Sequence, residues 1–124
     1  MQKTFALLVF ALLSFASAQT IPAVSSVSYS ISPTDSSGVS GTVYLGDYGL
    51  GNTIVAISLN GTTSGQHPAH FHSGNCDSNG DVVVPLENVD GATGLSITVT
   101  SVPIATILSG DHYINIHASP EDLA

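Results

Sequence analysis

The chain has 124 residues, of which 43% are hydrophobic and 8% are charged, and its only Lys or Arg is Lys3. Nine Asp and Glu residues give a formal net charge of −8 with neutral histidines. Proteins bind nucleic acids and anionic lipids largely through Lys and Arg, so we expect neither a nucleic acid nor a membrane as partner. The charge attracts cations, although acidity also serves simply to keep a secreted protein soluble.

Residues 1–18 have the layout of a cleaved secretory signal peptide. Lys3 precedes an apolar run from Phe5 to Phe15, and small residues follow at 16–18. The run is too short to span a bilayer. Cleavage after Ala18 leaves 124 − 18 = 106 residues, which suits a single domain over 19–124, and removing Lys3 changes the charge to 0 − 9 = −9. We therefore expect a secreted, extracellular protein.

The first half of the mature chain reads as short β-strands. Segments 25–32 and 40–47 alternate polar with apolar residues, and segment 52–59 sets Val55, Ile57 and Leu59 on one face. Turns rich in Gly, Asn, Asp and Ser separate these segments. Such regular spacing predicts an all-β sandwich or barrel.

The second half continues the pattern. Segment 81–89 is a β-branched run that Pro85 interrupts, which suits an edge strand or a strand end. Segment 95–102 alternates cleanly, and segment 112–117 is the last strand-like run. We read segment 101–110 as a turn or loop, despite some helical spacing of its apolar residues.

Three of the five histidines lie in HPAHFH, residues 67–72. Alternate residues of a strand share a face, so His70 and His72 point to one side while Phe71 points into the core. His117 ends segment 112–117, and the three imidazoles converge if the two strands are neighbours. Neutral imidazole suits copper, zinc or nickel. The alternative is that a His-x-His pair merely decorates a surface strand.

Three further residues are candidates for other roles. His67 has odd spacing from His70, and Pro68 restricts its backbone, so we read it as a structural, hydrogen-bonding histidine. Cys76 is the only cysteine, so its thiol is free, capped or paired between chains. Asn60 begins the sequon Asn-Gly-Thr, which predicts N-glycosylation.

HPAHFHSGNC, residues 67–76, resembles the copper-strand signature of the copper/zinc superoxide dismutases, and SGDHYINIHASPEDL, residues 109–123, resembles that family's later copper-binding segment. NGDVVVPL and YINIH are also similar to the CHRD domain, a secreted β module. The first resemblance implies an immunoglobulin-like, Greek-key β-sandwich. It also implies copper ligation by His70, His72 and His117, a structural role for His67, and an acidic residue that orients the histidines at Asp122, with Glu121 as the alternative.

The chain also departs from the dismutase pattern. Only residues 73–81 separate the first ligand pair from the next strand, and none is histidine, so we expect no zinc site and no fourth copper ligand. There is no arginine to attract superoxide. The family's last strand, which carries the disulfide partner of the matching cysteine, has no counterpart, so we expect Cys76 to be unpaired and the sheet edge to be open or covered.

Three functions follow as alternatives. The first is a secreted domain that holds one copper ion through three histidines, and it is the one we favour. The second is a copper-only superoxide dismutase, which converts superoxide to oxygen and hydrogen peroxide. The third is a metal-free extracellular structural domain of the CHRD type. A homodimer through Cys76 or an open sheet edge is compatible with each of them.

Overall fold

The computed structural model describes residues 26–33, 36–77 and 80–121. Within these ranges the chain forms seven strands and one short helix, α2 (Ile104–Leu108). The strands are β1 (Ser26–Ile31), β2 (Ser40–Gly49), β3 (Asn52–Asn60), β4 (Gln66–Ser73), β5 (Val82–Asp90), β6 (Leu95–Thr100) and β7 (His112–Ile116). They pair antiparallel in the order β1-β2-β3-β6-β5-β4-β7. The predicted all-β class is confirmed.

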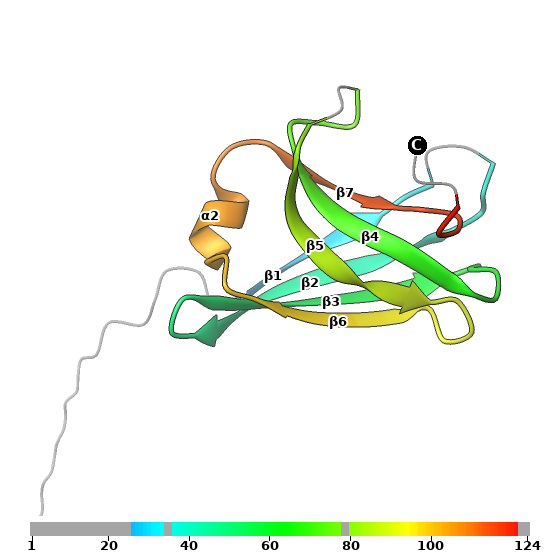
Figure 1. Ribbon diagram of the computed structural model, residues 1–124, viewed down its shortest axis with the longest axis horizontal. Helices are drawn as coiled ribbons and strands as arrows, with labels where there is room; N and C mark the ends of the chain where they lie inside the picture. Colours follow the sequence, from blue (N-terminus) through cyan, green and yellow to red (C-terminus); the bar gives the residue numbers. More distant parts are fainter. Residues whose placement is uncertain (1–25, 34–35, 78–79, 122–124) are drawn as a thin grey trace, which may run out of the picture.

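The sheet curls so that its two halves face one another (Figure 1). One half contains β1, β2, β3 and β6, and the other contains β5, β4 and β7. The bend lies between β5 and β6, which share a single residue pair, Asp90 with Leu95. The inner sides of the two halves enclose the core, which is formed by Val43, Leu45, Val55, Ile57, Leu59, Ala69, Phe71, Val84, Val89, Ile104 and Ile107.

In β3, buried and exposed side chains alternate as the sequence predicts. Val55, Ile57 and Leu59 are buried, whereas Ser58 between two of them is exposed. Full burial of such a side chain contributes roughly 1.5–3 kcal/mol, so this face fixes which side of the strand turns inward.

Where β5 and β6 diverge, side-chain hydroxyls replace the backbone ladder. Ser96 and Thr98 point inward, and the Ser96 hydroxyl donates to the Glu87 carbonyl at 2.7 Å while the Thr98 hydroxyl accepts from the Glu87 N–H at 2.8 Å. The separation also explains Pro85, which lies inside a nine-residue strand that has a neighbour on each side. In the sheet order β5 is not an edge strand, but it pairs with β6 only at Asp90, so at Pro85 its other side is unpaired and the missing N–H costs no ladder hydrogen bond.

Segment 101–110 differs from the predicted turn or loop. Ile104–Leu108 form one turn of α-helix, in which the Pro103 carbonyl accepts from the N–H groups of Thr106 and Ile107. Ile104 and Ile107 are buried, so α2 covers one end of the core (Figure 1). The helical spacing of the apolar residues in this segment was therefore a better guide than the turn-forming residues on either side of it. The described residues contain no helix with the length and hydrophobicity of a membrane span.

Candidate metal centre

Strand β4 turns its histidines to opposite sides. His67, Ala69 and Phe71 are buried toward the core, whereas His70 and His72 are only partly buried and lie on the outward face. Phe71 anchors the strand between the two outward imidazoles. His67 therefore points to the opposite side of β4 from His70 and His72, as its spacing in the sequence predicts.

Strand β7 lies directly beside β4. The imidazoles of His70, His72 and His117 can converge only if these two strands are neighbours. His70 pairs with Asn115 and His72 with Tyr113, so these side chains share the outward face. His117 follows the end of β7, and its N–H donates to the Pro68 carbonyl at 2.8 Å. This bond continues the β4–β7 pairing to His117, whose side chain is only 7% exposed.

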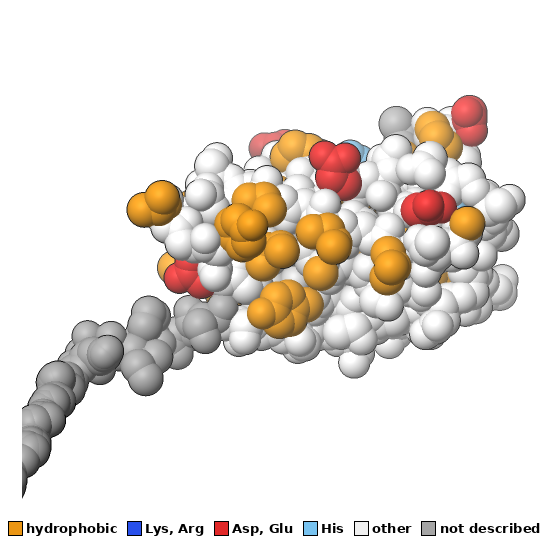
Figure 2. Space-filling model, turned by 90° about the horizontal axis from the view of Figure 1, so that it is seen from below, with side chains coloured by type: hydrophobic (Ala, Val, Ile, Leu, Met, Phe, Trp, Pro, Cys, Tyr) orange, Lys and Arg blue, Asp and Glu red, His pale blue; other side chains and the backbone are white. Residues whose placement is uncertain are grey.

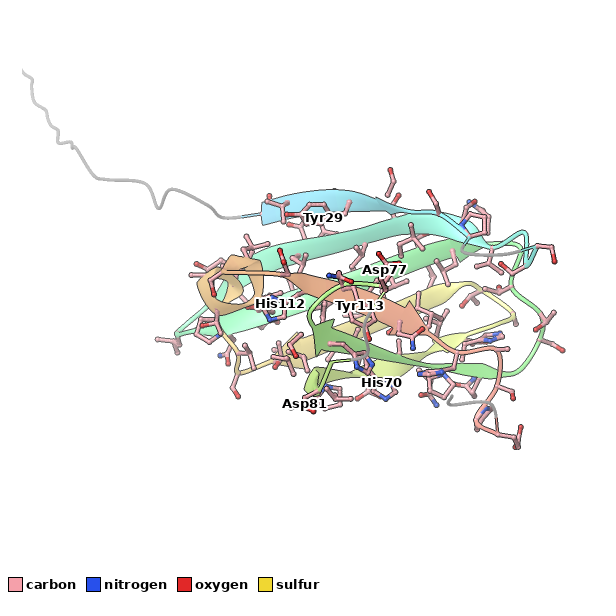
Figure 3. All side chains as sticks on the ribbon, turned by 90° about the horizontal axis from the view of Figure 1, so that it is seen from above. Tyr29, His70, Asp77, Asp81, His112 and Tyr113 are labelled. Atoms are coloured by element: carbon pink, nitrogen blue, oxygen red, sulfur yellow. The ribbon has the colours of Figure 1, made fainter. Side chains whose placement is uncertain are left out.

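His70 is the middle member of a chain of ring contacts. Its ring centre lies 5.3 Å from that of His117 and 5.7 Å from that of His72, both edge to face. On the far side, the His72 ring stacks on Tyr113 with ring centres 5.1 Å apart and planes at 14°. Figure 3 shows His70 and Tyr113 on the neighbouring strands that bring them together. The stack limits how far His72 can turn.

Two ring nitrogens of this cluster are buried without a hydrogen-bond partner, Nδ1 of His70 and Nε2 of His72. The other nitrogen of His72, Nδ1, lies 2.9 Å from the Gly80 carbonyl oxygen. A carbonyl only accepts, so Nδ1 carries the proton and Nε2 of the neutral ring has a free lone pair. A buried lone pair without a donor is unfavourable unless a proton, a water molecule or a metal ion satisfies it.

Burial lowers the pKa of His70 below its ordinary value, and the nearby His117 and His72 lower it further through repulsion of a positive charge. The neutral ring is therefore the form that the site favours near neutral pH. Neutral imidazole is also the form that binds a metal ion.

The donor set suits a borderline or soft metal ion. Imidazoles that share one ion at about 2.1 Å have ring centres roughly 5 Å apart, close to the two separations given above. In the described part of the chain, however, no three His, Cys, Asp or Glu side chains are already gathered as a metal-holding group. Binding therefore requires His72 or His117 to turn toward the lone pair of His70.

His67 links the backbone around this cluster. Its Nδ1 lies 3.1 Å from the carbonyl oxygen of His117, and its Nε2 lies 2.8 Å from that of Thr63. The neutral ring can donate to only one of these oxygens at a time. Gly91 lies against it, because a Cβ there would come within 2.9 Å of Nε2. His67 therefore helps to hold His117 in place from the core side.

Of the remaining sequence candidates, Asp122 lies outside the described residues. Asn60 is exposed at the end of β3, where an attached glycan would meet solvent. Cys76 is exposed and unpaired in the turn after β4.

Sequence reasoning missed two partners of His72. The Gly80 carbonyl comes from the segment before β5, and no residue pattern shows that this backbone folds back onto the ring. Tyr113 had a signal, since it shares a face with His117, but its register against His72 depends on the pairing of two distant strands.

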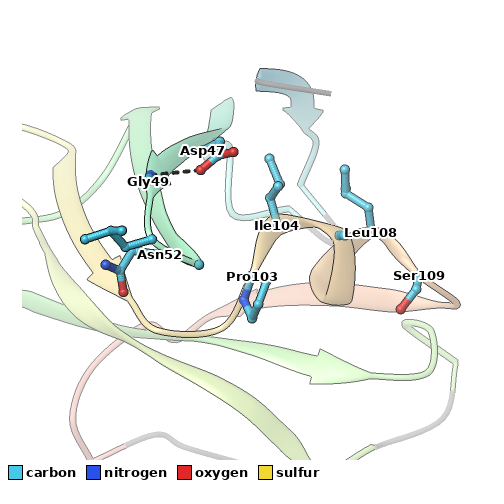
Figure 4. Close-up of a pocket in the computed structure, with 10 residues that line it drawn as sticks. Asp47, Gly49, Asn52, Pro103, Ile104, Leu108 and Ser109 are labelled. Atoms are coloured by element: carbon cyan, nitrogen blue, oxygen red, sulfur yellow. Dashed lines mark hydrogen bonds between the residues drawn. The ribbon is translucent and has the colours of Figure 1, made fainter. Parts of the chain in front are cut away.

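Two hollows lie elsewhere. One of about 540 Å³ separates the β2–β3 hairpin from α2 (Figure 4). Its only titratable lining residue is Asp47, whose carboxylate already accepts the Gly49 N–H at 2.9 Å. This hollow therefore has few side-chain groups that could bind or react with a polar ligand.

The other hollow, of about 410 Å³, lies between the sheet's two edge strands and is lined by Tyr29 of β1 and Tyr113 of β7. Phe71 and other core residues line it as well, with Cys76 and His112. It marks the place where the curled sheet does not close into a barrel.

Comparison with known families matches the CHRD domain over residues 20–120. No curated protein and no solved structure gave a match. The CHRD part of the resemblance is thus supported, whereas the superoxide dismutase part is not. CHRD domains occur in extracellular proteins. Because the match covers most of the chain, this protein belongs to the CHRD domain family.

Proposed function

We propose that this CHRD domain is a secreted metal-binding module that holds one copper ion through His70, His72 and His117. The observation that carries the proposal is the pair of buried, unpartnered nitrogens, His70 Nδ1 and His72 Nε2, on adjacent rings of one strand face. A metal ion would give both nitrogens a partner. His117 is the third donor because its ring touches that of His70.

Copper is the favoured ion for three reasons. Imidazole sites bind copper(II) most tightly of the divalent first-row metals. The chain's charge of −8 attracts cations, and its only Lys or Arg lies in residues 1–18. Three neutral donors also suit copper(I). We do not expect a separate zinc site of the dismutase type, because residues 73–81, between β4 and β5, contain no histidine.

The experiment is a titration of the metal-free protein, beginning at residue 19, with copper(II), copper(I) and zinc. We expect one copper per chain and nitrogen hyperfine structure in the copper(II) spectrum. His70→Ala should abolish binding, whereas His112→Ala should leave it intact. His112 is the matched control, because it lies on β7 with its Nδ1 also buried and unpartnered, yet its ring does not contact the rings of His70, His72 or His117. Copper(I) is titrated in a Cys76→Ser background to remove the free thiol.

A metal-free structural domain is the second candidate, favoured by the absence of a pre-gathered ligand set among the described residues. It predicts no stoichiometric copper and no dependence on His70. Equal losses in His70→Ala and His112→Ala would likewise contradict the three-histidine site. Neither outcome would affect membership of the CHRD family.

A further inference from the structure

The outward side of β1, β2, β3 and β6, here called the uncharged face, carries no charged side chain. Its positions are Ser26, Ser28, Ser30, Ser40, Thr42, Tyr44, Gly46, Tyr48, Asn52, Ile54, Ala56, Ser58, Asn60, Leu95, Ile97 and Val99. In a chain with nine acidic residues this is unusual. Asp47 is in β2, but it pairs with the buried Thr53 and so belongs to the other side of the strand. Glu87 and Asp90 lie on the neighbouring strand β5.

In β6 the usual pattern of a sheet with one solvent-exposed side, apolar residues inward and polar residues outward, is reversed. Its hydroxyl residues Ser96 and Thr98 point inward, while Ile97 points outward and is 63% exposed. Leu95 and Val99 flank it, each about half exposed. Strands that face water normally place the apolar set inside, so this arrangement leaves an apolar strip to be covered.

The strip extends across three strands in register. Ile97 pairs with Ala56, which pairs with Tyr44, and the next row contains Val99 with Ile54. The Tyr44 ring lies over Gly46, because a Cβ at Gly46 would come within 2.9 Å of it. Figure 2 looks onto the molecule from this side and shows hydrophobic side chains gathered together, with acidic ones at the margins. The result is an apolar strip across β2, β3 and β6 that is bordered by hydroxyl and amide side chains.

From this surface we propose that the uncharged face, apart from Asn60 at the end of β3, is the contact between two copies of the chain, packed sheet against sheet. Two copies that each carry −8 repel one another wherever acids meet, and this face contains none. A basic partner would find no carboxylate here to bind. An uncharged sheet face with an apolar strip can pack against a second copy of itself, and two copies of the same face form a closed, two-fold pair.

The available area fits a weak dimer. The four strands have six to ten residues each. At about 3.4 Å per residue and 4.8 Å between strands, the face covers roughly 500 Å² per copy. Two copies would bury about 1,000 Å², near the lower limit for a specific interface. The proposal does not depend on copper binding, since the histidines lie on the other half of the sheet.

Sedimentation equilibrium of the protein beginning at residue 19, from micromolar to near-millimolar concentration, tests the proposal. We expect a monomer–dimer equilibrium whose dissociation constant rises by at least about tenfold in Ile97→Glu. Leu50→Glu is the matched control, because Leu50 is a fully exposed apolar residue of the β2–β3 hairpin and the substitution adds the same charge. Val99→Ser weakens the face without adding charge, and circular dichroism checks that each variant is folded.

A wild-type chain that stays monomeric throughout this range would overturn the proposal. Equal effects of Ile97→Glu and Leu50→Glu would do the same, because they would reduce the result to net charge. A dimer lost in Cys76→Ser or on reduction would instead place the contact at the thiol. A dimer that survives both Ile97→Glu and Val99→Ser would point to the open edges of β1 and β7.

Discussion

The two halves of the sheet share one core but present different chemistry to solvent. The half that contains β4, β5 and β7 displays partly buried imidazoles together with the acids Glu87 and Asp90. The outward face of the other half displays hydroxyls, amides and an apolar strip, and Asp47, near the end of β2, is the one charged residue in its four strands. Their inward faces, by contrast, are alike, since both bury aliphatic side chains in the same cluster.

This difference separates what folding requires from what it leaves free. The inward positions must fill one core, so their character is set by packing. The outward positions have no such demand, and each half has acquired its own character. We propose that one half binds a cation and that the other packs against a like-charged copy of the chain. The two surfaces are therefore where variants should act independently.

The largest effect is expected at the core position between two candidate ligands. Phe71→Ala should lower the free energy of unfolding by about 3–5 kcal/mol, because it leaves a cavity beneath His70 and His72. It should also weaken copper binding by loosening β4. Ile97→Ala on the uncharged face, measured by the same urea titration, should change stability by less than about 0.5 kcal/mol. Similar losses at the two positions would show that the outer strip is part of the core.

His67→Ala should have the next largest effect. It removes the ring that lies against the carbonyls of Thr63 and His117, so we expect a loss of about 1–3 kcal/mol in unfolding free energy. Copper affinity should fall as well, since His117 loses its support. His67→Gln keeps one donor and should recover part of both losses. Unchanged copper affinity in His67→Ala would separate this residue from the site.

Thr98→Val tests the seam that joins the halves. The change preserves shape but removes the hydroxyl that accepts from the Glu87 N–H, so it should cost about 1 kcal/mol and speed hydrogen exchange at that amide. Thr42→Val makes the same change on the uncharged face, where no hydrogen bond of the Thr42 hydroxyl is recorded. It should leave that amide's exchange as it is. Equal protection of the Glu87 amide in both variants would mean that water takes over the bond.

Much of this arrangement followed from residue patterns. Alternation in β3 predicted the buried set Val55, Ile57 and Leu59, and spacing in β4 predicted that His70 and His72 share a face opposite His67. These features are local, because neighbouring side chains of one strand have only two directions available.

Other features depend on contacts between distant segments, which local patterns do not show. Pro85 indicated a strand side without a backbone partner, but not that β6 would still lie next to β5 in the sheet order. The free Nε2 of His72 depends on the path of the backbone at Gly80. The sequence of β6 shows that polar and apolar residues alternate. It does not show that the polar set is the one that faces inward.

The smallest effect is expected from pH, and it should distinguish the histidine half from the rest of the metal-free protein. The pKa of His70 is lowered in the folded state, so below the ordinary histidine pKa of about 6.5 the unfolded chain takes up its proton first. Stability should therefore be fully present above that pH and fall as the pH drops through it toward the lower folded value. Urea titrations between neutral pH and the onset of carboxylate titration should show this slope, and His70→Asn should flatten it while Ile97→Ser leaves it unchanged. A slope that is identical in His70→Asn would mean that this ring is not desolvated, and the case for its buried lone pair as a metal ligand would weaken with it.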